Sequence, residues 1–166
     1  MAIESIPIQG LWGLIRRLPS FFLRWYFTSE KLGRLIYVDL RPCHDSAVIN
    51  LGQGANFRVY LQAINLSPFP VELDRASFRF WCGGVTLNAS ILKKQLIGPG
   101  EITGLSLQEA IPDGHANQIA KCLEKNMIAL DGNIEFNCKV RSFAKNIGHL
   151  DGINAKVFNP QFRATA

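Results

Sequence analysis

The most regular alternation of hydrophobic and polar positions in the chain lies between residues 56 and 82. In the first half of this stretch every second residue is apolar: Phe57, Val59, Leu61 and Ala63. In the second half the same spacing recurs at Phe78, Phe80 and Cys82. A period of two is typical of a strand with one buried face. Pro68 and Pro70 stand between the halves and cannot occupy a central strand, so we expect the chain to turn or cross over there.

Similar patterns predict strands over residues 35–40, 47–51, 85–91, 102–107, 133–143 and 153–158. Over residues 113–126 apolar positions recur every three or four residues, which predicts one short helix capped by Asp113. About seven short strands, glycine and proline turns and a single helix indicate a mainly β fold, an antiparallel β-sandwich of the immunoglobulin or fibronectin III type. We divide the chain into an N-terminal helical segment (residues 1–34), the sandwich domain (residues 35–160) and a tail (residues 161–166).

The N-terminal segment contains a nearly continuous apolar run over residues 10–27, GLWGLIRRLPSFFLRWYF. Arg16, Arg17 and Arg24 interrupt it, and arginine near the middle of a membrane span is costly. A cleavable signal peptide would carry its cations before the apolar run, followed by a small-residue cleavage site. We therefore expect neither a spanning helix nor a signal peptide.

On a helical wheel of about 100° per residue, the three arginines gather with Gly13 and Ser20 on one narrow arc. Such an amphipathic pattern is typical of a helix in a membrane interface, where aromatic rings lie at headgroup depth and arginines reach phosphates. Pro19 is expected to kink the helix or divide it in two. The residues predicted to contact a membrane or a partner are Leu11, Trp12, Leu14, Ile15, Arg16, Arg17, Leu18, Phe21, Phe22, Arg24, Trp25, Tyr26 and Phe27.

Other roles for this segment stay open. The helix could dock into a larger protein assembly or a homo-oligomer, or it could be buried in the core of its own domain. A further alternative is that a lipid or another apolar ligand is carried between the helix and the sandwich. The apolar arc is too wide for packing on one side alone, and this favours contact with a membrane.

The charge of the chain points in the same direction. The 166 residues carry a formal net charge of +5, with a pI near 9.2, which suits an anionic partner. A membrane surface with anionic lipid is the partner that we expect. Nucleic-acid binding would need cations and exposed aromatics on one sheet face. Tyr60 beside Arg58 and Trp81 beside Arg79 are the candidates for such a face, but we do not expect nucleic acid as the partner.

The four cysteines show no CxxC spacing, so we expect reduced core thiols and no structural zinc. Cys82 and Cys138 have the parity of their apolar neighbours and could meet in the core. Reduced thiols point to a reducing compartment, and we expect a cytoplasmic protein on the inner face of a membrane.

Candidate catalytic chemistry is sparse. The run Cys43-His44-Asp45 contains a nucleophile, a base and an acid, but adjacent residues do not face one another. His115, and His149 with Asp151, lack a third ligand at a suitable spacing. We therefore expect no enzyme activity, no metal and no cofactor.

Two stretches resemble a known family. Residues 65–73, NLSPFPVEL, resemble the asparagine-plus-proline stretch that leads into a strand in the late-embryogenesis-abundant group 2 domain, also called the water-stress and hypersensitive-response (WHy) domain. Residues 78–85, FRFWCGGV, resemble the family's next strand and glycine turn, and the likeness extends over about residues 45–158. The resemblance implies a fibronectin III-like sandwich without catalytic residues, often membrane-associated and linked to stress protection. The aromatic N-terminal segment departs from the soluble members of that family and favours attachment.

Overall fold

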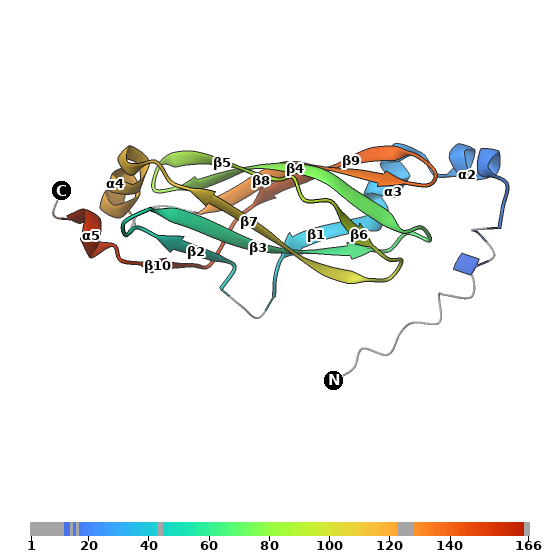
Figure 1. Ribbon diagram of the computed structural model, residues 1–166. Helices are drawn as coiled ribbons and strands as arrows, with labels where there is room; N and C mark the ends of the chain where they lie inside the picture. The colour runs from blue at the N-terminus through green and yellow to red at the C-terminus, as the bar shows by residue number, and fades with distance from the viewer. Residues whose placement is uncertain (1–11, 14, 16, 43–44, 123–127, 165–166) are drawn as a thin grey trace, which may run out of the picture.

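Two β-sheets pack face to face in the computed structural model, which describes residues 12, 13, 15, 17–42, 45–122 and 128–164 (Figure 1). This arrangement confirms the mainly β sandwich. The strands are β1 (Ile36–Leu40), β2 (Ala47–Asn50), β3 (Asn56–Asn65), β4 (Val71–Cys82), β5 (Val85–Ile91), β6 (Gln95–Ile97), β7 (Ile102–Ala110), β8 (Ala129–Cys138), β9 (Ser142–Leu150) and β10 (Ala155–Phe158). The helices are α2 (Ser20–Tyr26), α3 (Ser29–Leu35), α4 (Asp113–Cys122) and α5 (Gln161–Ala164). Figure 1 shows α2 and α3 at one end of the sandwich and α4 and α5 at the other.

A long central strand organises each sheet. In the first sheet β3 pairs antiparallel with β7 along one edge and with β1 and β2 along the other, and β10 pairs parallel with β2. In the second sheet β4 pairs antiparallel with β8 along one edge and with β5 and β6 along the other, and β9 extends the sheet beyond β8. The long stretch over residues 56–82 is therefore divided between the two sheets.

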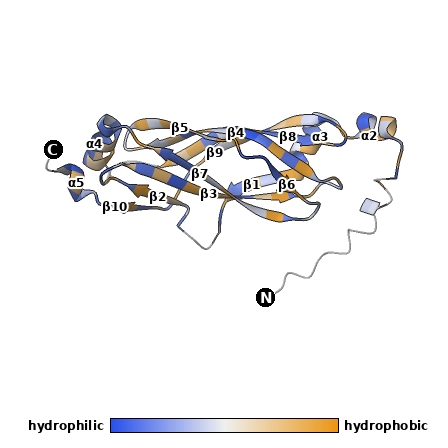
Figure 2. Ribbon diagram, viewed as in Figure 1, coloured by the Kyte–Doolittle hydropathy of each residue, from blue (hydrophilic) through white to orange (hydrophobic). Residues whose placement is uncertain are grey.

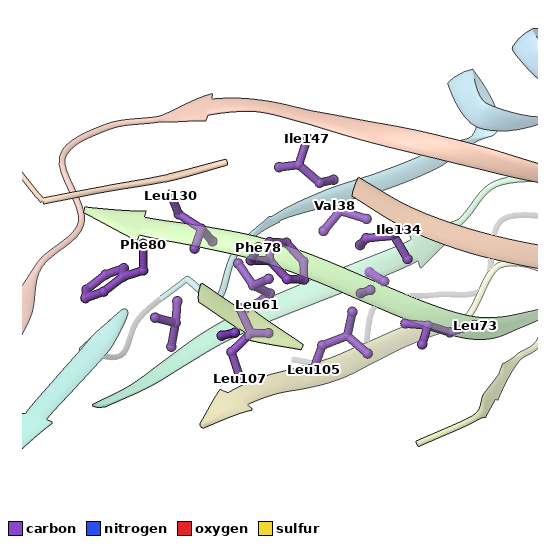
Figure 3. Packing of buried hydrophobic residues seen from close by; sticks show 14 of the residues in the cluster. Val38, Leu61, Leu73, Phe78, Phe80, Leu105, Leu107, Leu130, Ile134 and Ile147 are labelled. Carbon is purple, nitrogen blue, oxygen red and sulfur yellow. The ribbon is translucent and has the colours of Figure 1, made fainter. Parts of the chain in front are cut away.

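The core lies between β3 and β4. Every second side chain of β3 is buried, as the alternation predicted, and in β4 the same holds on either side of a bulge between Leu73 and Arg75. The rings of Phe57 and Phe80 stack across the interface with centroids 4.8 Å apart. Figure 3 shows Leu61 and Leu107 of the first sheet directed toward Phe78 of the second. Burial of large apolar side chains from both sheets provides the main driving force for this fold.

The connection between β3 and β4 crosses from one sheet to the other and is held by Asn65. Its amide nitrogen donates hydrogen bonds to the carbonyl oxygens of Phe69 (2.8 Å) and Ile97 (3.0 Å). Its amide oxygen accepts from the backbone N–H (2.9 Å) and the hydroxyl (2.7 Å) of Ser67. Both polar side chains are fully buried, and this network satisfies them without water.

One predicted strand was wrong. Residues 133–143, expected as a single strand, belong to the hairpin of β8 and β9, which turns over residues 139–141. The turn contains no glycine, proline or asparagine, and Val140 in it is buried, so the alternation runs through the turn without a signal. This hairpin and the short β6 bring the described strands to ten, against the seven or so expected.

Asp131-Gly132 lies within β8, between Leu130 and Asn133, where the register shifts. A Cβ atom at Gly132 would lie 2.5 Å from the carbonyl oxygen of Ser77 and closer still to the ring of Phe78. Glycine is therefore required here by close packing and not by a turn.

Arg163 of α5 closes the end of the sandwich opposite α2 and α3 (Figure 1). Residues 161–164, placed in the tail by the sequence division, form this short helix. The Arg163 guanidinium is buried and donates to the carbonyl oxygens of Leu51 (2.9 Å) and Gly52 (3.0 Å). It also pairs with Asp113 at the start of α4 (2.7 Å). Arg163 thus connects α4 and α5 to the turn after β2.

Candidate functional site

Helix α2 is anchored to the sandwich by two side chains. It begins directly after Pro19. Leu23 and Phe27 are only 3% and 7% exposed and join the hydrophobic core. The ring of Phe27 packs edge-on against Phe69, with centroids 5.1 Å apart. Because Phe69 is held by the Asn65 network, the position of α2 depends on the crossover between the sheets.

Apart from Ser20 and Arg24, the other side chains of α2 are apolar or aromatic and uncovered, and so is Leu18 just before it. Trp25 is 79% exposed, Phe21 64%, and Leu18, Phe22 and Tyr26 are each half exposed or more. The rings of Phe21 and Phe22 lie against each other, with centroids 4.2 Å apart. Figure 2 shows α2 at the outer end of the molecule, with hydrophobic and hydrophilic positions side by side along it. We call Leu18, Phe21, Phe22, Trp25 and Tyr26 the aromatic face. A contiguous apolar patch on a folded surface marks a site of interaction.

Segments far apart in the sequence support this helix. A guanidinium nitrogen of Arg141, in the β8–β9 turn, donates to the carbonyl oxygen of Arg24 on α2. Helix α3 follows after Thr28, whose hydroxyl caps it by accepting from the Lys31 N–H (3.3 Å). A Cβ atom at Gly33 would lie 3.3 Å from the carbonyl oxygen of Ala144, which shows how closely α3 approaches β9.

Cations occur on the segments next to the aromatic face: before and on α2, on α3, and in the β8–β9 turn that contacts α2 through Arg141. Arg17, Arg24, Lys31 and Lys139 are exposed and make no ion pair with any carboxylate that the structure describes. The Lys31 ammonium lies 4.3 Å from the centre of the Tyr26 ring, a cation–π arrangement. The nearby Glu30 is paired with Arg34. We call Arg17, Arg24, Lys31 and Lys139 the basic rim.

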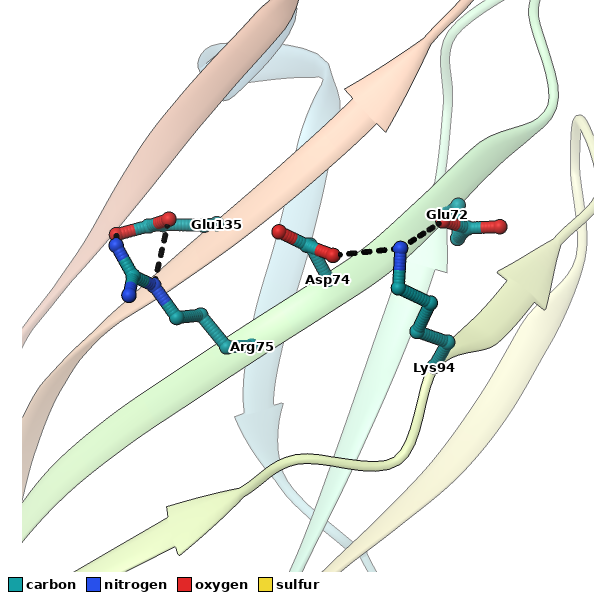
Figure 4. A network of polar contacts seen from close by, with 5 residues as sticks. All are labelled: Glu72, Asp74, Arg75, Lys94 and Glu135. Atoms are coloured by element: carbon teal, nitrogen blue, oxygen red, sulfur yellow. Dashed lines mark hydrogen bonds and ion pairs between the residues drawn. The ribbon is translucent and has the colours of Figure 1, made fainter.

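The cations on the outer face of the second sheet are different. Lys94 bridges Glu72 (3.2 Å) and Asp74 (2.9 Å), and Arg75 forms a bidentate pair with Glu135 (Figure 4). The hydrogen bond from Lys94 lowers the pKa of the Asp74 carboxyl. Arg79 is likewise paired with Asp131 (2.7 Å). These pairs link β4 to β8 and to the connection between β5 and β6, and they leave little net charge, so they do not extend the basic rim.

Two apolar cavities, both open to solvent, lie along α2. The first, of about 390 Å³, is lined by side chains of α2 together with Ile15, Leu18 and Phe27, so that part of the aromatic face forms its wall. The second, of about 400 Å³, continues toward α3 and the crossover, where Leu66 and Lys31 line it. Ile15, Tyr26 and Phe27 line both cavities, so the two adjoin.

The structure distributes the predicted contact residues unevenly. Leu11, Leu14 and Arg16 lie outside the described residues. Trp12 and Ile15 are half-buried and line the cavities. The exposed ones are Arg17, Leu18, Phe21, Phe22, Arg24, Trp25 and Tyr26. Phe27, included from the pattern, is buried against Phe69 instead of facing outward.

Sequence reasoning missed Lys31, Lys139 and Arg141. Lys31 follows the apolar run that defined the candidate segment, and the other two are more than a hundred residues away in the chain. Only the fold brings the β8–β9 turn beside α2.

The weaker candidate sites do not assemble. Tyr60 with Arg58 lies on the first sheet and Trp81 with Arg79 on the second, so they share no sheet face. His149 contacts Asp151 (2.9 Å), and no group of three potential metal ligands occurs among the described residues. Cys43 and His44 lie outside the described residues.

Cys82 and Cys138 do not meet. Both lie on strands of the second sheet, but Cys138 stands opposite Val71, at the other end of β4 from Cys82. Val71 and Cys82 are eleven residues apart along β4, which corresponds to roughly 36 Å at about 3.3 Å per residue. Shared parity places both residues on one face but says nothing of their position along the strands. Neither Cys82 nor Cys138 forms a disulfide.

Among the helices that the structure describes, none combines the length and apolar composition needed to cross a bilayer.

No protein-family model and no curated protein matches the chain. Solved structures do resemble it. An X-ray structure of a structural-genomics target has a TM-score of 0.49 at 12% identity, covering 70% of this chain and 84% of that one. A solution structure of an Arabidopsis thaliana protein has a TM-score of 0.43 at 15% identity, covering 72% and 79%. The solution structure of a late embryogenesis abundant (LEA) protein has a TM-score of 0.35 at 10% identity, covering 93% and 94%.

Likenesses at these scores assign neither a family nor an activity. The sandwich itself follows from the strand pairing of this chain.

Proposed function

We propose that the protein is a non-catalytic β-sandwich module that attaches to a membrane surface through the aromatic face and the basic rim. The observation that carries the proposal is the division of α2. Leu23 and Phe27 are buried, while the aromatic face beside them remains half or more exposed. Aromatic side chains flanked by cations are typical of segments that lie in the headgroup region.

The apolar contribution is that of a weak, reversible anchor. Burial of one large apolar side chain contributes roughly 1.5–3 kcal/mol when the side chain starts fully exposed. Scaled by their exposed fractions, the five side chains of the aromatic face could contribute about 1 kcal/mol each, or about 5 kcal/mol together. This is close to the binding of a single myristoyl chain, which needs a second signal for stable attachment.

The basic rim supplies that second signal. A lysine or arginine near an anionic leaflet contributes about 1 kcal/mol, and the effect falls away within a Debye length. Arg17, Arg24, Lys31 and Lys139 are available for this role because none is neutralised by a described carboxylate. We place the protein on the inner face of a membrane, where anionic lipids are concentrated and cysteines stay reduced.

The sandwich then serves as a scaffolding or binding module held at the membrane. Its resemblance to the LEA group 2 domain supports a role linked to stress, and its outer faces carry polar, ion-paired side chains that remain in water.

Flotation of the full chain with liposomes tests the proposal. The wild type should float with vesicles containing phosphatidylserine, and the double variant Phe22→Ser, Trp25→Ser should not. The matched control is Phe158→Ser, Phe162→Ser, which removes two exposed aromatic side chains at the opposite end and should leave flotation unchanged.

A second pair of variants tests the charges. Arg17→Glu, Lys139→Glu should weaken binding to anionic vesicles by at least about tenfold, and added salt should reduce the difference from wild type. Lys121→Glu, Lys156→Glu, which changes the net charge equally at exposed positions outside the rim, should bind like the wild type. Equal flotation of wild type and the Phe22, Trp25 variant would refute the proposal. Self-association through α2 without flotation would also refute it, in favour of a protein interface.

A further inference from the structure

The two adjoining cavities along α2 have linings that suit a ligand that is apolar along most of its length. Each falls within the range of small-molecule sites, about 300–1,000 Å³. The first is lined by apolar and aromatic side chains of α2 together with Ile15 and Phe27. A peptide in this space would leave its amide groups without partners, at a cost in free energy, whereas a hydrocarbon chain has no such groups.

The charged side chains that line the second cavity are both cationic. Lys31 lines this cavity, rests over the Tyr26 ring at 4.3 Å, and is paired with no described carboxylate. Arg34 lines it as well and is held by Glu30. A ligand that fills the cavities and ends beside these residues would therefore be apolar with one anionic end.

We propose that the cavities bind one acyl chain of an anionic single-chain lipid, with its phosphate or carboxylate beside Lys31. This inference rests on the proposed function, because a protein seated in a headgroup layer is within reach of such lipids. The protein would then bind one lipid molecule per chain at this site, in addition to the contact of the aromatic face and the basic rim with the membrane surface. The aromatic face, which forms part of the wall of the first cavity, would contact both the bilayer and the single lipid.

Isothermal titration calorimetry and native mass spectrometry of the full chain test the site without a membrane. The probe is myristoyl lysophosphatidic acid below its critical micelle concentration, compared with monomyristoyl glycerol, which has the same chain and no phosphate. We expect one molecule of the phosphate lipid per protein chain and weaker binding of the neutral lipid.

Two variants locate the site. Ile15→Trp should fill the junction of the cavities and reduce affinity by about tenfold or more. Leu66→Trp, at a half-exposed position of the second cavity, is a second blocking variant should the first fail to fold. Leu92→Trp, at an exposed position outside both cavities, is the control and should bind like the wild type. Lys31→Met should remove most of the preference for the phosphate lipid and leave binding of the neutral lipid unchanged.

Failure of this inference differs from failure of the proposed function. Normal flotation with no saturable one-to-one binding would overturn the lipid site alone. One-to-one binding that both tryptophan blocking variants leave intact would also overturn it. One-to-one binding that these variants abolish, in a protein that does not float, would support the site and refute the membrane attachment.

Discussion

Replacement of Asn65 by alanine should destabilise the protein more than any surface change of similar size. The side chain is fully buried and makes four hydrogen bonds within the crossover. After truncation the Phe69 carbonyl oxygen still accepts a hydrogen bond from the Ser67 hydroxyl (3.0 Å). The Ser67 backbone N–H, however, loses its acceptor, and the Ile97 carbonyl oxygen loses a donor.

The magnitude follows from these losses. A buried donor left without a partner costs about 1–3 kcal/mol, and each further lost bond about 1 kcal/mol. We therefore expect Asn65→Ala to lower the free energy of unfolding by about 3 kcal/mol. For a chain of this length, 1 kcal/mol shifts Tm by about 2–4 °C, so Tm should fall by about 10 °C.

Thermal and urea unfolding followed by circular dichroism measure this change. Asn88→Ala, at an exposed position on β5, is the matched control and should stay within about 0.5 kcal/mol of the wild type. Ser67→Ala belongs to the same network, so its effect and that of Asn65→Ala should not be additive in the double variant. A fall in Tm of less than about 2 °C for Asn65→Ala would refute the view that this network holds the crossover.

Three further predictions concern other parts of the fold. Gly132→Ala should lower stability by about 1–3 kcal/mol, since its methyl group would collide with the Phe78 ring, whereas Gly148→Ala on β9, with open space around it, should cost much less in the same thermal unfolding assay. Arg163→Met should lower stability by about 2 kcal/mol, because two carbonyl groups lose a charged donor; unchanged urea unfolding would contradict the proposed closure of this end. Cys82 should resist iodoacetamide in the native protein at mildly alkaline pH, because burial shields its thiol and raises its pKa to about 11. It should react after unfolding, and rapid native labelling at Cys82, measured by peptide mass spectrometry, would contradict this.

Much of the sandwich could be predicted because half of each central strand faces the core. Alternation in β3 and β4 follows directly from that burial. The alternation does not reveal which sheet a strand joins, because a strand with one buried face has the same pattern in either sheet. The split at the crossover depends on hydrogen bonds of Asn65 to residues as distant as Ile97, which no local pattern encodes.

The β8–β9 hairpin and the candidate site illustrate the same limit. The hairpin turn has no glycine or proline, so the sequence gives no sign of reversal there. The composition of the N-terminal segment suggested an apolar surface, but a helical wheel could not show that Phe27 packs on Phe69. The basic rim joins residues from both ends of the chain and becomes visible only when the β8–β9 turn is placed beside α2.

The most direct test of membrane attachment uses Trp25 as its own reporter. A chain with Trp12→Phe and Trp81→Phe retains Trp25 as its sole tryptophan. With phosphatidylserine vesicles its emission should shift to shorter wavelength, and lipids brominated on the upper acyl chain should quench it. The companion chain with Trp12→Phe and Trp25→Phe, which reports from Trp81 on the sandwich, should show neither change. Unaltered Trp25 emission at vesicle concentrations that saturate flotation would show that the aromatic face does not enter the membrane.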